Sequence, residues 1–181
     1  ANLLNDSYQE FIINPSVEVT VLAYRPIKIY LKGEIQQPGV KVLRGSMKAF
    51  DTYEENTNNR ENNNSFGSNY FPTVFDAIRA GGGITQYSDL SKIRIIRKNS
   101  LSEGGGKITT IIDFQDFLRS GDSEVNLRIY DSDIIEVGYS NVSNNINLSK
   151  AISSGLNPRF VKVFVFGRVN NPGEIKLSSA S

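Results

Sequence analysis

The sequence predicts an α+β fold, in which a small mixed sheet carries a helix across one face. The first observation behind this prediction is a set of short runs in which apolar and polar residues alternate, as they do along half-buried strands. The second is that short helical patterns separate these runs. The third is a repeat: residues 25–43 (RPIKIYLKGEIQQPGVKVL) and residues 159–177 (RFVKVFVFGRVNNPGEIKL) align without a gap over 19 residues and agree at six positions. The repeat predicts a strand, a Pro-Gly turn and a return strand in each copy.

The composition excludes several classes of site. The 181 residues include no cysteine and no histidine. Disulfides and thiolate chemistry are therefore excluded, and the usual general base and zinc ligand are missing. We expect no enzyme activity, no cofactor and no metal site. The net charge is +1 and no basic stripe is present, so the sequence does not favour nucleic acid as a partner.

The amino-terminal part of the chain predicts a helix, a strand and a hairpin. Residues 2–13 have apolar side chains near helical spacing, and valines alternate with polar residues over 17–21. The first copy of the repeat then predicts a strand over 27–31 and a turn over 36–39. Residues 51–70 contain seven asparagines and almost no aliphatic side chain, so we expect a solvent loop or a disordered insertion there.

A helix is predicted directly after this insertion. Thr73 and Asp76 have the spacing of a capping box, with Asp in the place of the usual Glu or Gln. Val74, Phe75 and Ile78 supply an apolar face. We expect the helix to end at Gly81 because glycine accepts the left-handed conformation that ends many helices.

The central part of the chain predicts two strands, a second helix and a closing strand. Residues 93–96 are an apolar strand that a glycine-rich connection joins to the next strand. Asp113 is placed to cap the following helix, and Gly121 to end it. Residues 134–137 form the closing strand after a tight turn. A polar linker and a short helix over residues 146–155 lead to the second copy of the repeat.

These elements, in this order, resemble the SLBB domain, a soluble ligand-binding β-grasp module. The resemblance is carried by the hairpin G-x-x-x-x-PG, a helix ending in Ala-Gly-Gly, the strand IRIIR and the closing DSDIIEV, with a second hairpin after them. The positions that match the family motif have structural roles, and they are Gly33, Pro38, Gly39, Ala80, Gly81, Gly82, Asp133, Gly167, Pro172 and Gly173. The family usually has glycine before the aspartate of the closing turn, whereas this chain has Ser132.

More narrowly, the chain resembles the outer-membrane polysaccharide export family, whose members form capsule or exopolysaccharide translocons. This resemblance divides the chain into four parts. Residues 1–24 are the end of a preceding export domain, and residues 25–140 are a first SLBB-like β-grasp domain with the insertion at 51–70. Residues 141–158 are a linker and short helix, and residues 159–181 are the truncated start of a second SLBB-like repeat.

The same resemblance implies a function without catalysis. The expected role is a structural and assembly module of a translocon, in the periplasm and associated with the outer membrane. The implied partners are further copies in a ring-forming homo-oligomer, the polysaccharide itself, and an inner-membrane polysaccharide co-polymerase. The alternative is a sensor module that binds a soluble ligand or a glycan. A concave pocket with polar groups at its rim would favour the alternative, and a flat surface with complementary patches would favour the assembly module.

Four basic residues are candidates for contact with an anionic sugar: Lys28, Lys32, Arg94 and Arg97. The first two share the outer face of one strand, and the other two flank an apolar stretch of another. A solvated sheet face is the alternative interpretation for all four. Asp131 and Asp133 are expected to face solvent and to bond the local backbone rather than a metal ion. The two glycine clusters are expected to end a helix and to form a hairpin loop rather than to bind phosphate.

Two aromatic residues in the second copy of the repeat predict an interface. Phe164 and Phe166 occupy outward positions at which the first copy has Tyr30 and Lys32. Exposed aromatic side chains at this density mark interaction surfaces more often than free surface. We therefore expect the second hairpin to be ordered and to pack on the preceding domain or on a second molecule.

Overall fold

The computed structural model describes most of the chain outside the asparagine-rich insertion. The predicted insertion at 51–70 lies outside the described residues except for its last two positions, so its interpretation stays a prediction. The described residues are 4, 7–9, 11–19, 21, 23–48, 69–121 and 123–178. Among them, no helix has the length and hydropathy that crossing a membrane requires.

A five-stranded mixed sheet forms the centre of the fold, in the order β2-β1-β7-β5-β6. Its strands are β1 (Ile27–Gly33), β2 (Gly39–Leu43), β5 (Ser88–Lys98), β6 (Lys107–Ile112) and β7 (Ile134–Tyr139). The pair of β1 and β7 is parallel, and the other three pairs are antiparallel. Two short strands, β3 (Met47–Lys48) and β4 (Asn69–Tyr70), pair with each other outside this sheet.

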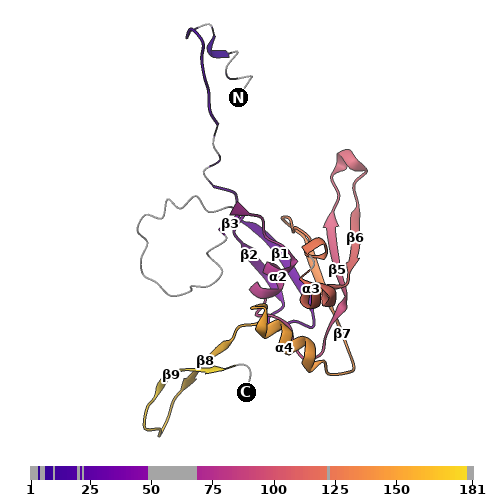
Figure 1. The fold of residues 1–181 in the computed structure, drawn as a ribbon, viewed down its shortest axis with the longest axis vertical. Helices are drawn as coiled ribbons and strands as arrows, with labels where there is room; N and C mark the ends of the chain where they lie inside the picture. The colour runs from indigo at the N-terminus through magenta and orange to yellow at the C-terminus, as the bar shows by residue number, and fades with distance from the viewer. Residues whose placement is uncertain are drawn as a thin grey trace.

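In the described part of the chain from residue 69 onward, the α-helices are α2 (Val74–Ala80), α3 (Phe114–Ser120) and α4 (Asn145–Ser153). Two short 3₁₀ helices, η1 (Leu101–Glu103) and η2 (Ser123–Val125), lie in the connections. The architecture confirms the predicted α+β class and has the mixed sheet of a β-grasp-like domain (Figure 1). The core is formed by apolar side chains of the sheet and the helices, among them Ile29, Leu31, Val74, Ile78, Leu90, Ile93, Phe114 and Ile135.

The predicted strand over 17–21 is not formed in the residues of this segment that the structure describes. None of residues 15–19 and 21 is assigned to a strand, and Val19 and Val21 are exposed. Alternating valines favour a strand only where a neighbouring strand can bond the backbone. In Figure 1 this segment runs away from the sheet, so no such neighbour is present.

Helix α2 begins as predicted but ends differently. The Asp76 carboxylate accepts hydrogen bonds from the backbone N–H of Thr73 at 2.8 Å and from its hydroxyl at 2.9 Å, which confirms the capping interaction. Gly81, however, has a φ of −81°, so it does not take the left-handed conformation that we expected. Glycine is needed there for space, because a Cβ atom would lie 2.7 Å from Cδ1 of the buried Leu31. The left-handed conformation occurs one residue later, at Gly82, with a φ of +79°.

Helix α3 begins and ends as predicted. The side chain of Asp113 accepts a hydrogen bond from the backbone N–H of Gln115 at 2.9 Å, which caps the first turn. Gly121 follows the last turn with a φ of +74°, in the left-handed region. Both ends were identified correctly because each depends on residues within one turn of the helix.

Residues 141–158 are part of the folded core rather than only a linker. They contain the predicted short helix, α4, and the side chains of Ala151 and Leu156 are fully buried. Asn157 binds the backbone of Ile84 from both sides of its amide: Oδ1 accepts from the N–H and Nδ2 donates to the carbonyl oxygen, each at 2.8 Å. Helix α4 is therefore attached to the segment that follows α2.

The sequence repeat is also a repeat of structure. Strands β8 (Phe160–Val165) and β9 (Gly173–Ser178) form an antiparallel hairpin. Its register is that of the first hairpin: Ile27 pairs with Leu43, and Val161 pairs with Leu177 at the corresponding positions. The glycine after the first strand has a positive φ in both copies, +83° at Gly33 and +106° in the second hairpin.

The surroundings of the two hairpins differ. Strand β1 is paired on its second edge with β7, whereas the sheet of β8 contains β9 alone within the described part of the chain. Figure 1 shows the second hairpin extending away from the body of the domain. Phe164 is 60% exposed and Phe166 is 79% exposed. The hairpin is ordered as predicted, but it does not pack on the preceding domain, and packing on a second molecule stays a prediction.

Candidate functional site

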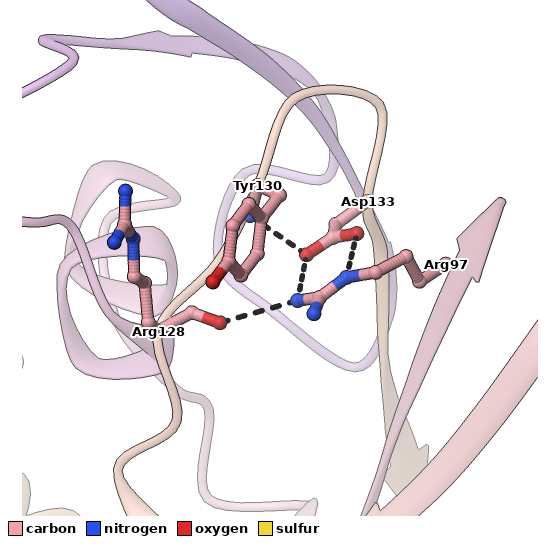
Figure 2. A network of polar contacts seen from close by, with 4 residues as sticks. All are labelled: Arg97, Arg128, Tyr130 and Asp133. Carbon is pink, nitrogen blue, oxygen red and sulfur yellow. Dashed lines mark hydrogen bonds and ion pairs between the residues drawn. The ribbon is translucent and has the colours of Figure 1, made fainter. Parts of the chain in front are cut away.

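The closing turn before β7 is organised by a buried carboxylate. Asp133 is fully buried, and its Oδ1 accepts a hydrogen bond from Nε of Arg97 at 2.9 Å. Its Oδ2 accepts from Nη2 of Arg97 at 2.7 Å and from the backbone N–H of Tyr130 at 2.8 Å (Figure 2). Ser132 has a φ of +69°, so the turn keeps the left-handed geometry with serine in place of the family's glycine. The expectation that Asp133 faces solvent was wrong, because the charge of Arg97 makes its burial possible.

Arg97 serves the fold rather than presenting a free charge. Its guanidinium holds Asp133 with two hydrogen bonds, and Nη2 also donates to the carbonyl oxygen of Arg128 at 3.2 Å. The hydrogen bond to Asp133 raises the pKa of Arg97 above its ordinary value, and the negative charge of that carboxylate acts in the same direction. The same guanidinium lies over the ring of Tyr130, 4.1 Å from its centroid. Arg97 thus binds the backbone of Arg128 directly, and its partner Asp133 binds the backbone of Tyr130.

A stack of arginine and aromatic side chains extends from this pair. The guanidinium of Arg128 lies 3.4 Å from the centroid of Phe71 and 4.9 Å from the centroid of Tyr130. The ring of Tyr24 meets Phe71 edge-to-face, with 5.2 Å between the centroids. Figure 2 shows Tyr130 between Arg128 and the pair of Arg97 and Asp133. We call Tyr24, Phe71, Arg128, Tyr130 and Arg97 the arginine–aromatic stack.

Arg128 carries the uncompensated charge of this stack. Three other arginines of the domain are paired with carboxylates: Arg25 with Asp131 at 3.0 Å, Arg94 with Glu136 at 3.3 Å, and Arg97 with Asp133 at 2.7 Å. Within the described ranges no carboxylate forms an ion pair with Arg128, although it is exposed. The stack therefore presents one guanidinium to solvent between two aromatic rings.

A hollow of about 460 Å³ lies beside α2 and α3. Phe75 and Phe117 form one part of its wall, with ring centroids 5.8 Å apart in an edge-to-face arrangement. The polar residues in its lining include Thr73, Asp76, Asn126 and Ser154. The hollow is open to solvent, and its lining combines aromatic and polar side chains.

The four predicted sugar contacts do not form one site. Lys28 and Lys32 lie exposed on the outer face of β1, as expected. The strand register places Lys32, Glu136 and Arg94 in one row across β1, β7 and β5, so the glutamate lies between the two cations. Arg94 and Arg97 are three positions apart on β5 and therefore point to opposite faces of the sheet. No observation tests glycan contact by these residues, and it stays a prediction.

The stack was missed in the sequence. Arg128 and Tyr130 are two residues apart on an extended segment, which places both side chains on one side and was a usable signal. Phe71 reaches them only because the segments before α2 and before the closing turn lie together, with Thr73 bridging to Arg128. That contact joins segments far apart in the chain, and no local pattern predicts it.

Comparison with known families supports the interpretation of the fold. The model of the SLBB domain matches residues 72–112. This range begins directly before α2 and runs through β5 to the end of β6. It includes the helix that ends in Ala-Gly-Gly and the strand IRIIR, two of the features on which the resemblance was based. Residues 72–112 therefore match the SLBB domain, and the fold around them is α+β and β-grasp-like.

Proposed function

We propose that the chain is a structural and assembly module of a polysaccharide-export machine. In this proposal copies form a ring in the periplasm, associated with the outer membrane, and the ring surrounds the path of the glycan. The polysaccharide and an inner-membrane polysaccharide co-polymerase are the proposed partners. The observation that carries the proposal is the second hairpin, which repeats the first in register but lacks the surroundings that the first has.

The inner face of the second hairpin keeps apolar residues at the positions that the first hairpin buries. In the first copy the buried residues at these positions are Ile29, Leu31, Ile35 and Leu43. Their counterparts are Val163, Val165, Val169 and Leu177, of which Val165 is half-buried and the others are exposed. An apolar set of this kind gains about 25 cal/mol for each Å² that a partner removes from water. The hairpin is therefore suited to packing against another folded surface.

The outer face of the same hairpin carries two phenylalanines beside the charged residues Lys162, Glu174 and Lys176. The rings of Phe164 and Phe166 stack on each other, with 6.2 Å between centroids and 14° between planes. Both rings remain exposed in the single chain. Strand β8 also has one edge without a strand partner in the described part, and such edges recruit other strands. The hairpin thus offers an apolar inner face, two phenylalanines and a strand edge for contact with another copy.

The experiment is the double change Phe164→Ser with Phe166→Ser, followed by light scattering over a range of concentrations. We expect the unaltered chain to exceed the monomer mass and the variant to return to it. The matched control is Val40→Ser with Val42→Ser, which removes two equally exposed valines from the first hairpin and should leave the mass unchanged. A monomeric unaltered chain at all concentrations, or an equal effect of both double changes, would contradict assembly through the second hairpin.

The alternative function is a sensor module that binds a soluble ligand or glycan, and the hollow beside α2 and α3 favours it. This alternative predicts saturable binding that Phe117→Ala weakens, because the change removes one wall of the hollow. Binding without any change in oligomeric mass would support the sensor over the assembly module.

A further inference from the structure

We propose that the arginine–aromatic stack binds a carboxylated sugar, with Arg128 holding the carboxylate. This inference rests on the proposed function, because it names the class of glycan that the assembled module contacts. It does not involve the hairpin or the hollow. The residues that contact the sugar are Tyr24, Phe71, Arg128 and Tyr130, and Arg97 acts as a positioning residue.

The geometry of Arg128 suits a carboxylate. Aromatic rings lie near the guanidinium at 3.4 Å from the centroid of Phe71 and at 4.9 Å from that of Tyr130. The N–H donors of a guanidinium lie in its plane, so stacking leaves them free to form paired hydrogen bonds at the edge of the group. Arg128 is exposed and has no carboxylate partner among the described residues, so an incoming anion displaces no protein group.

The aromatic residues supply the second half of a sugar site. Tyr24 and Tyr130 are both exposed, but guanidinium groups lie over the ring of Tyr130, so the ring of Tyr24 is the one open for packing. One face of a pyranose ring consists mainly of C–H groups and packs against an aromatic ring, while its hydroxyl groups stay in water. A carboxylated sugar combines this apolar face with an anion on the same small ring. The stack offers an aromatic ring for the apolar face of the sugar and, beside it, a guanidinium for the carboxylate.

The buried ion pair holds the backbone of two residues of the stack in place before any ligand arrives. Arg97 donates a hydrogen bond to the carbonyl oxygen of Arg128 at 3.2 Å, and Asp133 accepts one from the backbone N–H of Tyr130 at 2.8 Å. The backbone of Arg128 and that of Tyr130 are therefore held by the pair of Arg97 and Asp133. A surface fixed in this way loses little conformational freedom on binding, which favours affinity.

Other anionic ligands fit less well. Nucleic acid binds through several neutralised phosphates, and here one uncompensated guanidinium stands in a chain with a net charge of +1. A neutral sugar would bind Arg128 only through hydroxyl oxygens, without the charge and the paired acceptors of a carboxylate. A single carboxylate with one or two stacked rings gives weak binding, and a ring of copies would strengthen it by avidity along a polymer.

The test is an NMR titration of the ¹⁵N-labelled chain with trigalacturonate. The readouts are the Nε–Hε signal of Arg128 and the backbone amides of residues 128–130. The matched ligand is the same trisaccharide after reduction of its carboxyl groups to alcohols. We expect saturable shifts with the acid and a loss of at least about tenfold in affinity with the reduced sugar, since a charge-assisted pair is lost.

Protein variants localise the effect. Arg128→Gln should weaken binding about tenfold, and Arg128→Lys should weaken it less but measurably, because lysine keeps the charge without the planar pair of donors. Arg94→Gln is the control, since Arg94 is an exposed arginine already paired with Glu136, and it should leave affinity unchanged. Each variant is first checked for an intact amide spectrum.

Several outcomes would overturn the proposal. They are the absence of saturable shifts with the acid, equal binding of the reduced sugar, an equal loss with Arg94→Gln, and tighter binding of an oligothymidylate than of the acid. The proposal also fails separately from the assembly function. A chain that forms oligomers but shows none of these shifts would refute the sugar site alone, and Phe164→Ser with Phe166→Ser should leave the monomer's shifts intact.

Discussion

Replacing Asp133 by asparagine tests whether the buried ion pair holds the closing turn. Asparagine keeps the shape of the side chain but removes the charge and turns one acceptor into a donor. Whichever way the amide points, its NH₂ group faces a donor: Nε of Arg97 on one side, or Nη2 of Arg97 and the N–H of Tyr130 on the other. At least one of the three hydrogen bonds to the carboxylate is lost, and those that remain are weakened.

The magnitude follows from the burial of the two partners. Breaking a buried ion pair costs about 3–5 kcal/mol because one charge is left without a partner. The side chain of Asp133 is fully buried, but that of Arg97 is 37% exposed and regains water when its partner is lost. We therefore expect Asp133→Asn to lower the free energy of unfolding by about 2–3 kcal/mol. For a domain of this size that corresponds to a fall in Tm of about 6–15 °C.

The assay is urea unfolding followed by circular dichroism, with Tm from calorimetry. The control is Glu136→Gln, which breaks the pair with Arg94 on the outer face of the sheet. Both partners there are partly exposed, so the expected loss is below about 1 kcal/mol. A loss for Asp133→Asn no larger than that of the control would show that the closing turn does not depend on the buried pair.

Two further predictions concern the glycine of the repeat and the exposed carboxylate of the closing turn. Gly33→Ala should lower Tm more than Gly167→Ala. Both residues have positive φ, but an added Cβ atom meets the backbone of β7 at Gly33 and nothing within 4 Å at Gly167. The reverse order in calorimetry would contradict the parallel pairing of β1 with β7. The backbone N–H of Lys28, at 2.8 Å, is the main cause that lowers the pKa of Asp131. The ionised carboxylate therefore stabilises the fold above about pH 4, the unfolded value, and this stability is lost as the pH falls through the lower folded value. The difference in Tm between the unaltered chain and Asp131→Asn should be present at pH 7 and close toward pH 2, and a constant difference would refute this linkage.

Local chemistry explains which parts of the fold were predictable. The capping interactions of Thr73 with Asp76 and of Asp113 each involve groups within one helical turn, and both are confirmed. The alternation along β1 also predicted correctly that Lys28 and Lys32 face outward. Gly81 shows the limit of prediction from local sequence. It does end the helix, but glycine is required there because a side chain of β1 lies close, and not because its φ is positive.

Contacts between distant segments explain what was not predictable. The carboxylate of Asp133 looked like a solvent-facing turn residue because its partner, Arg97, lies on another strand. Burial of an aspartate depends on that partner, and the pattern around residue 133 carries no sign of it. The stack of Arg128 on Phe71 has the same origin. The candidate site thus consists of residues whose neighbours are set by the topology of the sheet.

Comparing the two copies of the hairpin shows which features depend on the hairpin's own sequence and which depend on the elements packed around it. The second copy keeps the register, the positive φ of the glycine and the apolar inner face, so these features belong to the hairpin itself. An isolated two-stranded hairpin is marginally stable in water, and the exposed ion pair between Lys162 and Glu174, at 3.1 Å, adds little. In the first copy the missing stability comes from β7 along one edge and from the helices over the inner face. The second copy needs an equivalent cover, and because apolar side chains occupy its inner face and two phenylalanines its outer face, we expect the hairpin to gain much of its stability only on assembly.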